Sequence, residues 1–173
     1  MGNAKAAGAR GALAAAVLAV QIAAGIAAGP ARAEDVEAAV RTGLALWRGS
    51  GCPDCHGAFA DGEKQRDEMP SGANLRRTRL DATGLRETIA CGRPGTGMPS
   101  FDDSAWKVRP CNGAAPGARP DELFPAPVAL SAADIDAVVA YLQARVIGKG
   151  SKVSKQECLA YYTDDPGWCD DDR

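Results

Sequence analysis

The sequence Cys52-Pro53-Asp54-Cys55-His56 constrains the fold of this chain more than any other feature. In a helical turn, residues three and four positions apart lie on the same face. Both thiols and the imidazole of His56 can therefore reach a single bound group placed beside that turn. His56 is the only histidine in the 173 residues, so the chain can offer this bound group only one imidazole ligand.

Three chemistries use such a cysteine pair. Thioredoxin-like proteins use a C-x-x-C dithiol at a helix that follows a strand, whereas here a helical pattern and a glycine-rich break precede Cys52. A structural zinc site needs further cysteine or histidine ligands at short spacing. The order C-x-x-C-H is the attachment signature of c-type haem, in which each thiol bonds one vinyl group and the histidine binds the iron. We expect one covalent haem c here, with a dithiol oxidoreductase as the alternative.

The chain is poor in the large side chains that build a protein core. It contains nine aromatic residues, three each of Trp, Tyr and Phe, beside 20 glycines and 11 prolines. Ordering irregular backbone costs conformational entropy, which a small apolar core offsets poorly. A porphyrin attached at Cys52 and Cys55 would supply the missing apolar body.

Apolar side chains recur at helical spacing in residues 35–48, 81–91 and 132–146. Residues able to form a capping box precede the third segment and a shorter fourth one in the tail: Ser131 with Asp134, and Ser154 with Glu157. No segment alternates with the period of two that strands require. The predicted fold class is all-α.

Two stretches, residues 57–79 and 93–127, are rich in glycine, proline and polar residues and are predicted to be loops. The second is long for a compact domain, and loops of that length are often functional. Three arginines lie close together near the end of the first stretch, and we expect them to form a solvated face: Arg76, Arg77 and Arg79.

Residues 1–33 have the pattern of a cleaved signal peptide. Lys5 and Arg10 give a positive start, residues 11–28 are apolar, and residues 31–33 read Ala-Arg-Ala, the small-x-small pattern of a cleavage site. The alternative is a retained membrane anchor, although the apolar run is short for a span and much of it is Ala and Gly. We expect cleavage, a periplasmic location and no membrane span afterwards.

The charge balance argues against a nucleic-acid partner. Loss of the leader removes three basic residues and leaves 17 basic against 22 acidic ones, a net charge of −5. A nucleic-acid-binding domain normally carries a basic patch or stripe. Aspartates gather at the end of the tail, where a solvated terminus is expected rather than a calcium or partner site: Asp164, Asp165, Asp170, Asp171 and Asp172.

A haem bound through His56 needs a sixth ligand or leaves an open position. After removal of the leader, the thioether candidates are Met69 and Met98. Met98 lies in Gly95-Thr96-Gly97-Met98-Pro99, where the glycines let the backbone approach a flat ring and the proline stiffens the turn. We predict that Met98 binds the iron and that Met69 is a loop residue. An iron held between imidazole and thioether has a raised potential.

The four remaining cysteines are expected to form disulfides, because an exported chain matures in an oxidising compartment. Four thiols allow three pairings. We favour Cys91–Cys111 and Cys158–Cys169, which close two separate short loops, and the sequence alone leaves the other pairings open. The first disulfide would bracket Met98.

These features together resemble the class I, mono-haem cytochrome c family. Gly43 and Trp47 in the first predicted helix resemble the family's G-x-x-x-aromatic element, and Tyr141 with Leu142 resembles the aromatic-aliphatic step of its last helix. The resemblance implies that these two helices cross, with Gly43 allowing close approach. It also implies a cytochrome c domain over residues 34–147, to which residues 148–173 add a C-terminal extension, and a distal ligand supplied by a G-x-G-M-P stretch.

The expected function is one-electron transfer between redox proteins, without substrate chemistry. A six-coordinate iron has no place for a substrate, so we expect a carrier rather than an enzyme. The alternative within haem proteins is an exchangeable sixth site, as in a sensor or enzyme. A periplasmic quinoprotein dehydrogenase or a terminal oxidase is the kind of redox partner that this hypothesis suggests, and we expect the carrier to be a monomer.

Overall fold

The computed structural model describes residues 33–162 together with residues 167 and 169. Within these residues the fold is helical, and β-type pairing is limited to two isolated bridges, Ser100 with Pro125 and Cys111 with Ala114. The all-α prediction is confirmed. Residues 1–32 of the leader predicted over residues 1–33, and the aspartates of the tail, lie outside the described residues.

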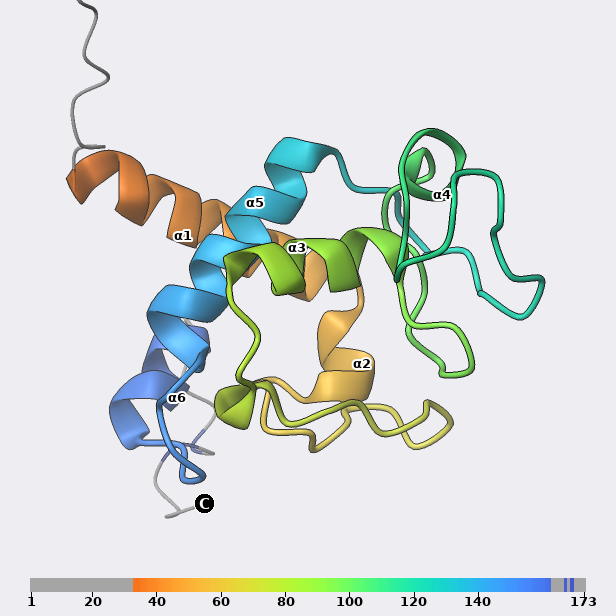
Figure 1. Ribbon diagram of the computed structural model, residues 1–173. Helices are drawn as coiled ribbons and strands as arrows, with labels where there is room; N and C mark the ends of the chain where they lie inside the picture. The colour runs from red at the N-terminus through yellow and green to blue at the C-terminus, as the bar shows by residue number, and fades with distance from the viewer. Residues whose placement is uncertain (1–32, 163–166, 168, 170–173) are drawn as a thin grey trace, which may run out of the picture. The chain divides into compact units, whose positions relative to one another are not determined.

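The helical segments follow one another as three longer helices separated by short ones (Figure 1). In chain order they are α1 (Ala33–Gly49), α2 (Cys52–His56), η1 (Leu75–Arg77), α3 (Ala82–Cys91), α4 (Ala105–Val108), α5 (Ala132–Tyr141), η2 (Leu142–Val146) and α6 (Lys155–Tyr161). No helix among the described residues combines the length and the apolar character that a membrane crossing requires.

Helices α1 and α5 cross in close contact, and a glycine makes the crossing possible. A Cβ atom added to Gly43 would lie 2.6 Å from the carbonyl carbon of Ala137 and 2.7 Å from Cβ of Tyr141, and would also meet the Ala137 oxygen. One turn further along α1, the ring centroids of Trp47 and Tyr141 lie 6.1 Å apart. The helix crossing that the sequence resemblance implied is therefore confirmed.

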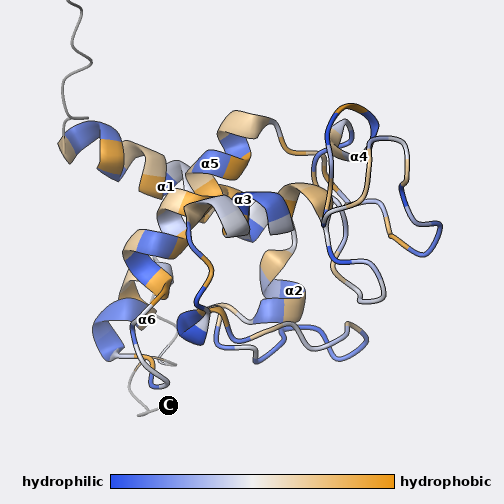
Figure 2. Ribbon diagram, viewed as in Figure 1, coloured by the Kyte–Doolittle hydropathy of each residue, from blue (hydrophilic) through white to orange (hydrophobic). Residues whose placement is uncertain are grey.

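Helix α5 begins with the predicted capping box and ends in an unpredicted π-helix. The Ser131 hydroxyl accepts from the backbone N–H of Asp134, whose carboxylate accepts from the Ser131 N–H. From Leu142 the chain continues as the π-helix η2, and the N–H of Ile147 donates to the Leu142 carbonyl. The stripe predicted for this segment is buried: Ile135, Val138, Val139, Leu142 and Val146. Figure 2 shows hydrophilic and hydrophobic residues alternating along α1, as a helix with one buried face requires.

The long loop after α3 is tied to the core by a disulfide and an indole. Cys91 at the end of α3 is bonded to Cys111, and both residues are fully buried. Trp106 in α4 is also buried, and its Nε1–H donates to the Cys91 carbonyl at 2.8 Å. The predicted disulfides are confirmed, because Cys158 is likewise bonded to Cys169. The loop prediction for residues 93–127 holds apart from the single turn of α4.

The expectation that the three arginines form one solvated face is wrong for Arg76. Arg77 and Arg79 are exposed, but Arg76 is only 3 % exposed and pairs with Glu157 of α6. The turn of η1 directs this one side chain inward, where the segment after η2 supplies backbone carbonyls. The C-terminal extension is thus packed onto the loop that follows the cysteine motif.

Candidate functional site

The cysteine motif forms a short helix directly after α1. Gly51 adopts a left-handed conformation, with φ of 77°, which turns the chain between α1 and α2. Pro53 lies in the first turn of α2, where a missing N–H costs nothing. His56 ends the helix before Gly57, so both cysteines and the histidine lie on consecutive turns of one short element, as predicted.

A backbone carbonyl fixes the orientation of the His56 imidazole. Nδ1 of His56 lies 2.8 Å from the Ala73 carbonyl oxygen. A carbonyl can only accept a hydrogen bond, so Nδ1 carries the proton and Nε2 presents its lone pair. Burial lowers the pKa of His56, against the opposing effect of the Ala73 hydrogen bond. The side chain is therefore held as a neutral imidazole, the form that binds a metal.

The loop that carries this carbonyl runs directly against the imidazole. A Cβ atom added to Gly72 would lie 2.6 Å from Nδ1 of His56, and the Gly72 N–H donates to the Cys55 carbonyl at 2.7 Å. A larger residue at position 72 would force the loop or the ring to move. Sequence reasoning missed both Gly72 and Ala73, although the glycines and proline of this loop were a signal of close backbone approach.

Cys52 and Cys55 are the cysteines that remain free, since the other four form the two disulfides. Burial raises the pKa of Cys52 to about 12, and burial also raises the pKa of Cys55. A nucleophilic redox cysteine requires a lowered pKa, because the thiolate is the reactive form. The raised pKa values of the two thiols are therefore the opposite of what the dithiol alternative requires.

Tyr161 of the C-terminal helix α6 packs against residues that flank the motif. The Tyr161 ring lies under the guanidinium of Arg48, 4.2 Å from its central carbon, and packs against Phe59 with ring centroids 5.3 Å apart. Burial raises the pKa of Tyr161. The C-terminal helix thus packs against residues that precede and follow the motif, and Cys52 itself is half-buried.

Met98 lies in a turn that abuts the loop over His56. The Met98 carbonyl accepts from the Arg93 N–H at 3.1 Å, and its side chain is partly buried against the core. Gly97 packs so closely on Pro70 that an added Cβ would collide with the proline ring. Pro70 precedes Gly72 by two residues, so the Met98 turn and the loop over His56 lie side by side.

Met69 occupies a different position from Met98. Its carbonyl accepts from Nζ of Lys64 at 2.9 Å, and its N–H donates to the Arg66 carbonyl at 3.0 Å. These contacts belong to a local turn within the loop. Met69 is thus the loop residue that the sequence predicted, while its possible use as a ligand has no support from these contacts.

Two buried polar atoms near His56 have no hydrogen-bond partner, namely Nε1 of Trp47 and Oδ1 of Asn74. The Trp47 ring lies 6.0 Å from the His56 ring, centroid to centroid, and Asn74 follows the residue whose carbonyl binds His56. Buried polar groups are normally paired. An unpaired indole N–H beside the imidazole, and an unpaired amide oxygen on the residue after Ala73, fit a site that is completed by a bound group with polar substituents, as haem is.

The described residues contain no group of three or more His, Cys, Asp or Glu side chains able to hold a metal ion. Haem iron does not need such a group, since the porphyrin supplies four nitrogens and the protein supplies the axial ligands. Comparisons with protein-family models, with curated proteins and with solved structures give no match to this chain. The residues and their geometry are therefore the basis for any functional assignment.

Proposed function

We propose that this chain is a mono-haem c-type cytochrome that carries one electron at a time between redox proteins. Cys52 and Cys55 would hold the porphyrin through thioether bonds, and His56 and Met98 would bind its iron. The observation that carries the proposal is the hydrogen bond from Nδ1 of His56 to the Ala73 carbonyl, within a C-x-x-C-H motif whose thiols are both free.

Each protein group has a separate part in this proposal. When bound, the haem supplies the one-electron chemistry of its iron. The Ala73 carbonyl holds His56 in the tautomer that offers Nε2, and such outer partners also raise the basicity of the ligand. The thioether of Met98 favours the ferrous state. The Cys91–Cys111 disulfide brackets Met98 and limits how far its turn can move.

The second candidate is a haem protein with an exchangeable sixth position. Met98 is only partly buried, which is compatible with a ligand that can leave the iron. Carbon monoxide distinguishes the two, because the reduced carrier keeps its thioether and binds the gas poorly, whereas an open iron binds it readily. The dithiol alternative would show no haem absorbance at all.

The test is to export the full chain from a host that attaches haem c and to compare Met98→Ala with Met69→Ala. We expect the wild type to show one covalent haem by the pyridine haemochrome spectrum. Met98→Ala should lose the thioether-to-iron absorption band and lower the potential by more than about 59 mV, a tenfold loss of ferrous preference. Met69→Ala should change neither property. An unchanged band in Met98→Ala removes Met98 from the ligand set.

The location and partners form part of the same proposal. A cleaved leader would place the mature chain in the periplasm as a monomer, where a quinoprotein dehydrogenase or a terminal oxidase is a suitable class of partner. The net charge of −5 predicted for the mature chain favours partners with a basic docking face. Reduction of the purified cytochrome by fractionated periplasm would identify the donor.

A further inference from the structure

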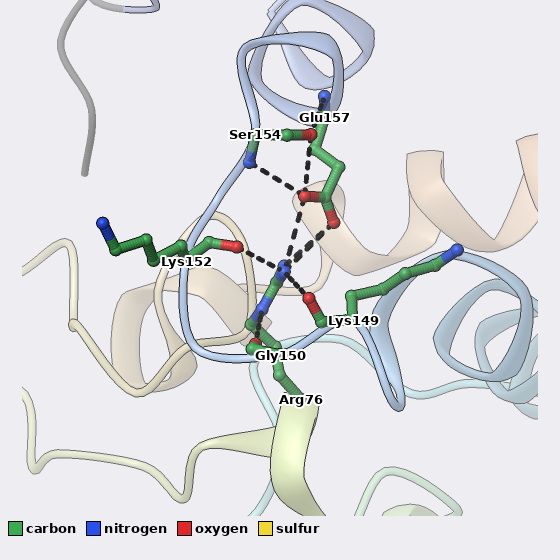
Figure 3. Close-up of polar contacts among 6 residues, drawn as sticks. All are labelled: Arg76, Lys149, Gly150, Lys152, Ser154 and Glu157. Carbon is green, nitrogen blue, oxygen red and sulfur yellow. Dashed lines mark hydrogen bonds and ion pairs between the residues drawn. The ribbon is translucent and has the colours of Figure 1, made fainter.

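Among the residues that the structure describes, Arg76 is a deeply buried charged side chain that lies outside the cysteine motif. Its guanidinium donates to the carbonyls of Gly150 at 2.7 Å, Lys152 at 3.0 Å and Lys149 at 3.1 Å. The same group pairs with the Glu157 carboxylate at 3.1 Å. The Arg76 side chain is 2 % exposed and that of Glu157 is 26 % exposed. Figure 3 shows the guanidinium enclosed by the chain after η2 and by the start of α6.

The Glu157 carboxylate is also held in place by contacts other than the one with Arg76. It accepts from the N–H of Ser154 at 2.9 Å and from the Ser154 hydroxyl at 3.0 Å, which completes the capping box of α6. The carboxylate is thus oriented by the helix start and does not depend on Arg76 for its position. A guanidinium bound by one oriented carboxylate and three carbonyls has its donors in a fixed geometry, as the planar fork of arginine favours.

The backbone of Arg76 belongs to the segment that orients His56. Three residues earlier, the Ala73 carbonyl binds Nδ1 of His56. Between them, the Leu75 N–H donates to the Ala60 carbonyl at 2.8 Å, and the Arg76 carbonyl accepts from Gly148 at 3.0 Å. The segment is therefore held on one side by the motif loop and on the other by the C-terminal extension.

We propose that Arg76 is a positioning residue for the axial histidine: by binding the C-terminal extension it holds the Ala73 carbonyl on Nδ1 of His56 and so tunes the haem potential. This inference rests on the proposed function and adds a use for the extension. With haem bound, the hydrogen bond that Nδ1 donates to the Ala73 carbonyl would increase the electron donation of the imidazole to the iron and favour the ferric state. If the Ala73 carbonyl were less firmly held, this electron donation would weaken and the reduction potential of the haem would rise.

The experiment compares Arg76→Lys with Arg77→Lys in the haem-loaded full chain. Both substitutions keep the positive charge, but only Arg76 is buried, because Arg77 is exposed. Lysine cannot reproduce the bidentate fork. We expect Arg76→Lys to shift the equilibrium toward ferrous iron about threefold. The reduction potential would then rise by about 28 mV, because a tenfold shift corresponds to about 59 mV for one electron. The Nδ1 proton of His56 should exchange with solvent at least tenfold faster, and Arg77→Lys should match the wild type.

Glu157→Gln provides a second variant if Arg76→Lys fails to fold, since it leaves the arginine and the shape of the cluster intact. It should move the potential and the exchange rate in the same direction by a smaller amount. These variants could instead have a lower melting temperature but the same potential and the same Nδ1 exchange rate as the wild type. That result would mean that the cluster only stabilises the fold. It would overturn the inference and leave the proposed function intact. A wild-type chain that binds no haem would overturn the proposed function itself.

Discussion

Replacing Gly43 with alanine tests the helix crossing on which the whole site is built. The added Cβ would lie 2.6 Å from the carbonyl carbon of Ala137 and 2.7 Å from Cβ of Tyr141. These distances fall about 0.7 Å short of the 3.4 Å at which ordinary contact begins. Because backbone atoms cannot rotate away, α1 and α5 must separate. Trp47, whose ring contacts both Tyr141 and His56, would move with α1.

The magnitude follows from two opposing effects. Overpacking a close contact costs about 1 to 3 kcal/mol, and a clash with backbone belongs at the upper end of that range. Alanine in place of glycine within a helix returns about 1 kcal/mol. The net loss for Gly43→Ala is therefore about 2 kcal/mol of unfolding free energy. With an m-value of roughly 2 kcal/mol/M, the urea midpoint should fall by about 1 M.

Gly49→Ala is the matched control, because Gly49 ends the same helix and a Cβ atom there would meet nothing within 4 Å. Its midpoint should stay the same or rise slightly, by no more than about 1 kcal/mol in free energy. Urea unfolding followed by circular dichroism measures both variants. A Gly43→Ala protein as stable as Gly49→Ala would show that the crossing tolerates a side chain, and the account of α1 and α5 would have to be abandoned.

Three further outcomes are expected. Replacing Cys91 and Cys111 with serine should cost about 3 kcal/mol, the chain-entropy value for a 20-residue loop, measured by denaturant unfolding; a loss below 1 kcal/mol would contradict it. Burial tends to raise the pKa of Glu157, but hydrogen bonds from Ser154 and Arg76 outweigh burial and lower the pKa. The Glu157 carboxylate therefore stabilises the fold fully at pH values above its ordinary pKa of 4.5. This contribution is lost as the pH falls through the lower pKa of the folded state. The wild type should have an unfolding free energy about 1.5 kcal/mol higher than that of Glu157→Gln at neutral pH, and this difference should shrink in acid. A difference that does not depend on pH would refute the stabilising role of the Glu157 carboxylate. Gly72→Ala should reduce covalent haem yield several-fold, because its Cβ occupies the space of the His56 ring, and a normal yield would contradict that placement.

Local sequence signals predicted the longer helices and the disulfides. The capping residues Ser131 and Ser154 act within their own turns, so short-range rules suffice to find the helices that follow them. The same holds for the motif residues of the site, whose spacing carries the chemistry. Cys91–Cys111 could be favoured because loop closure depends mainly on separation along the chain.

The features that the sequence did not reveal depend on contacts between distant segments. Every residue carries a carbonyl, so nothing in the sequence distinguishes Ala73 as the partner of His56; the path of the loop decides it. Arg76 resembles its exposed neighbours in sequence, and it is buried because carbonyls more than 70 residues away meet it. The π-helix of η2 also has no local signature, since its stripe of apolar residues fits an ordinary helix equally well.

The packing of Tyr161 against Arg48 and Phe59, which flank the cysteine motif in the sequence, has a consequence for the order of events during maturation. Tyr161 lies in the last helix of the described chain, more than a hundred residues after Cys52. Cys52 is half-buried in the folded chain, so we expect a reagent as bulky as a porphyrin to reach its thiol more readily while the end of the chain is still undocked. Under the proposed function, bond formation at Cys52 therefore precedes final closure, and a maleimide should label Cys52 rapidly in urea and slowly in the folded, haem-free chain. Equal rates would show that the closing helix is no barrier.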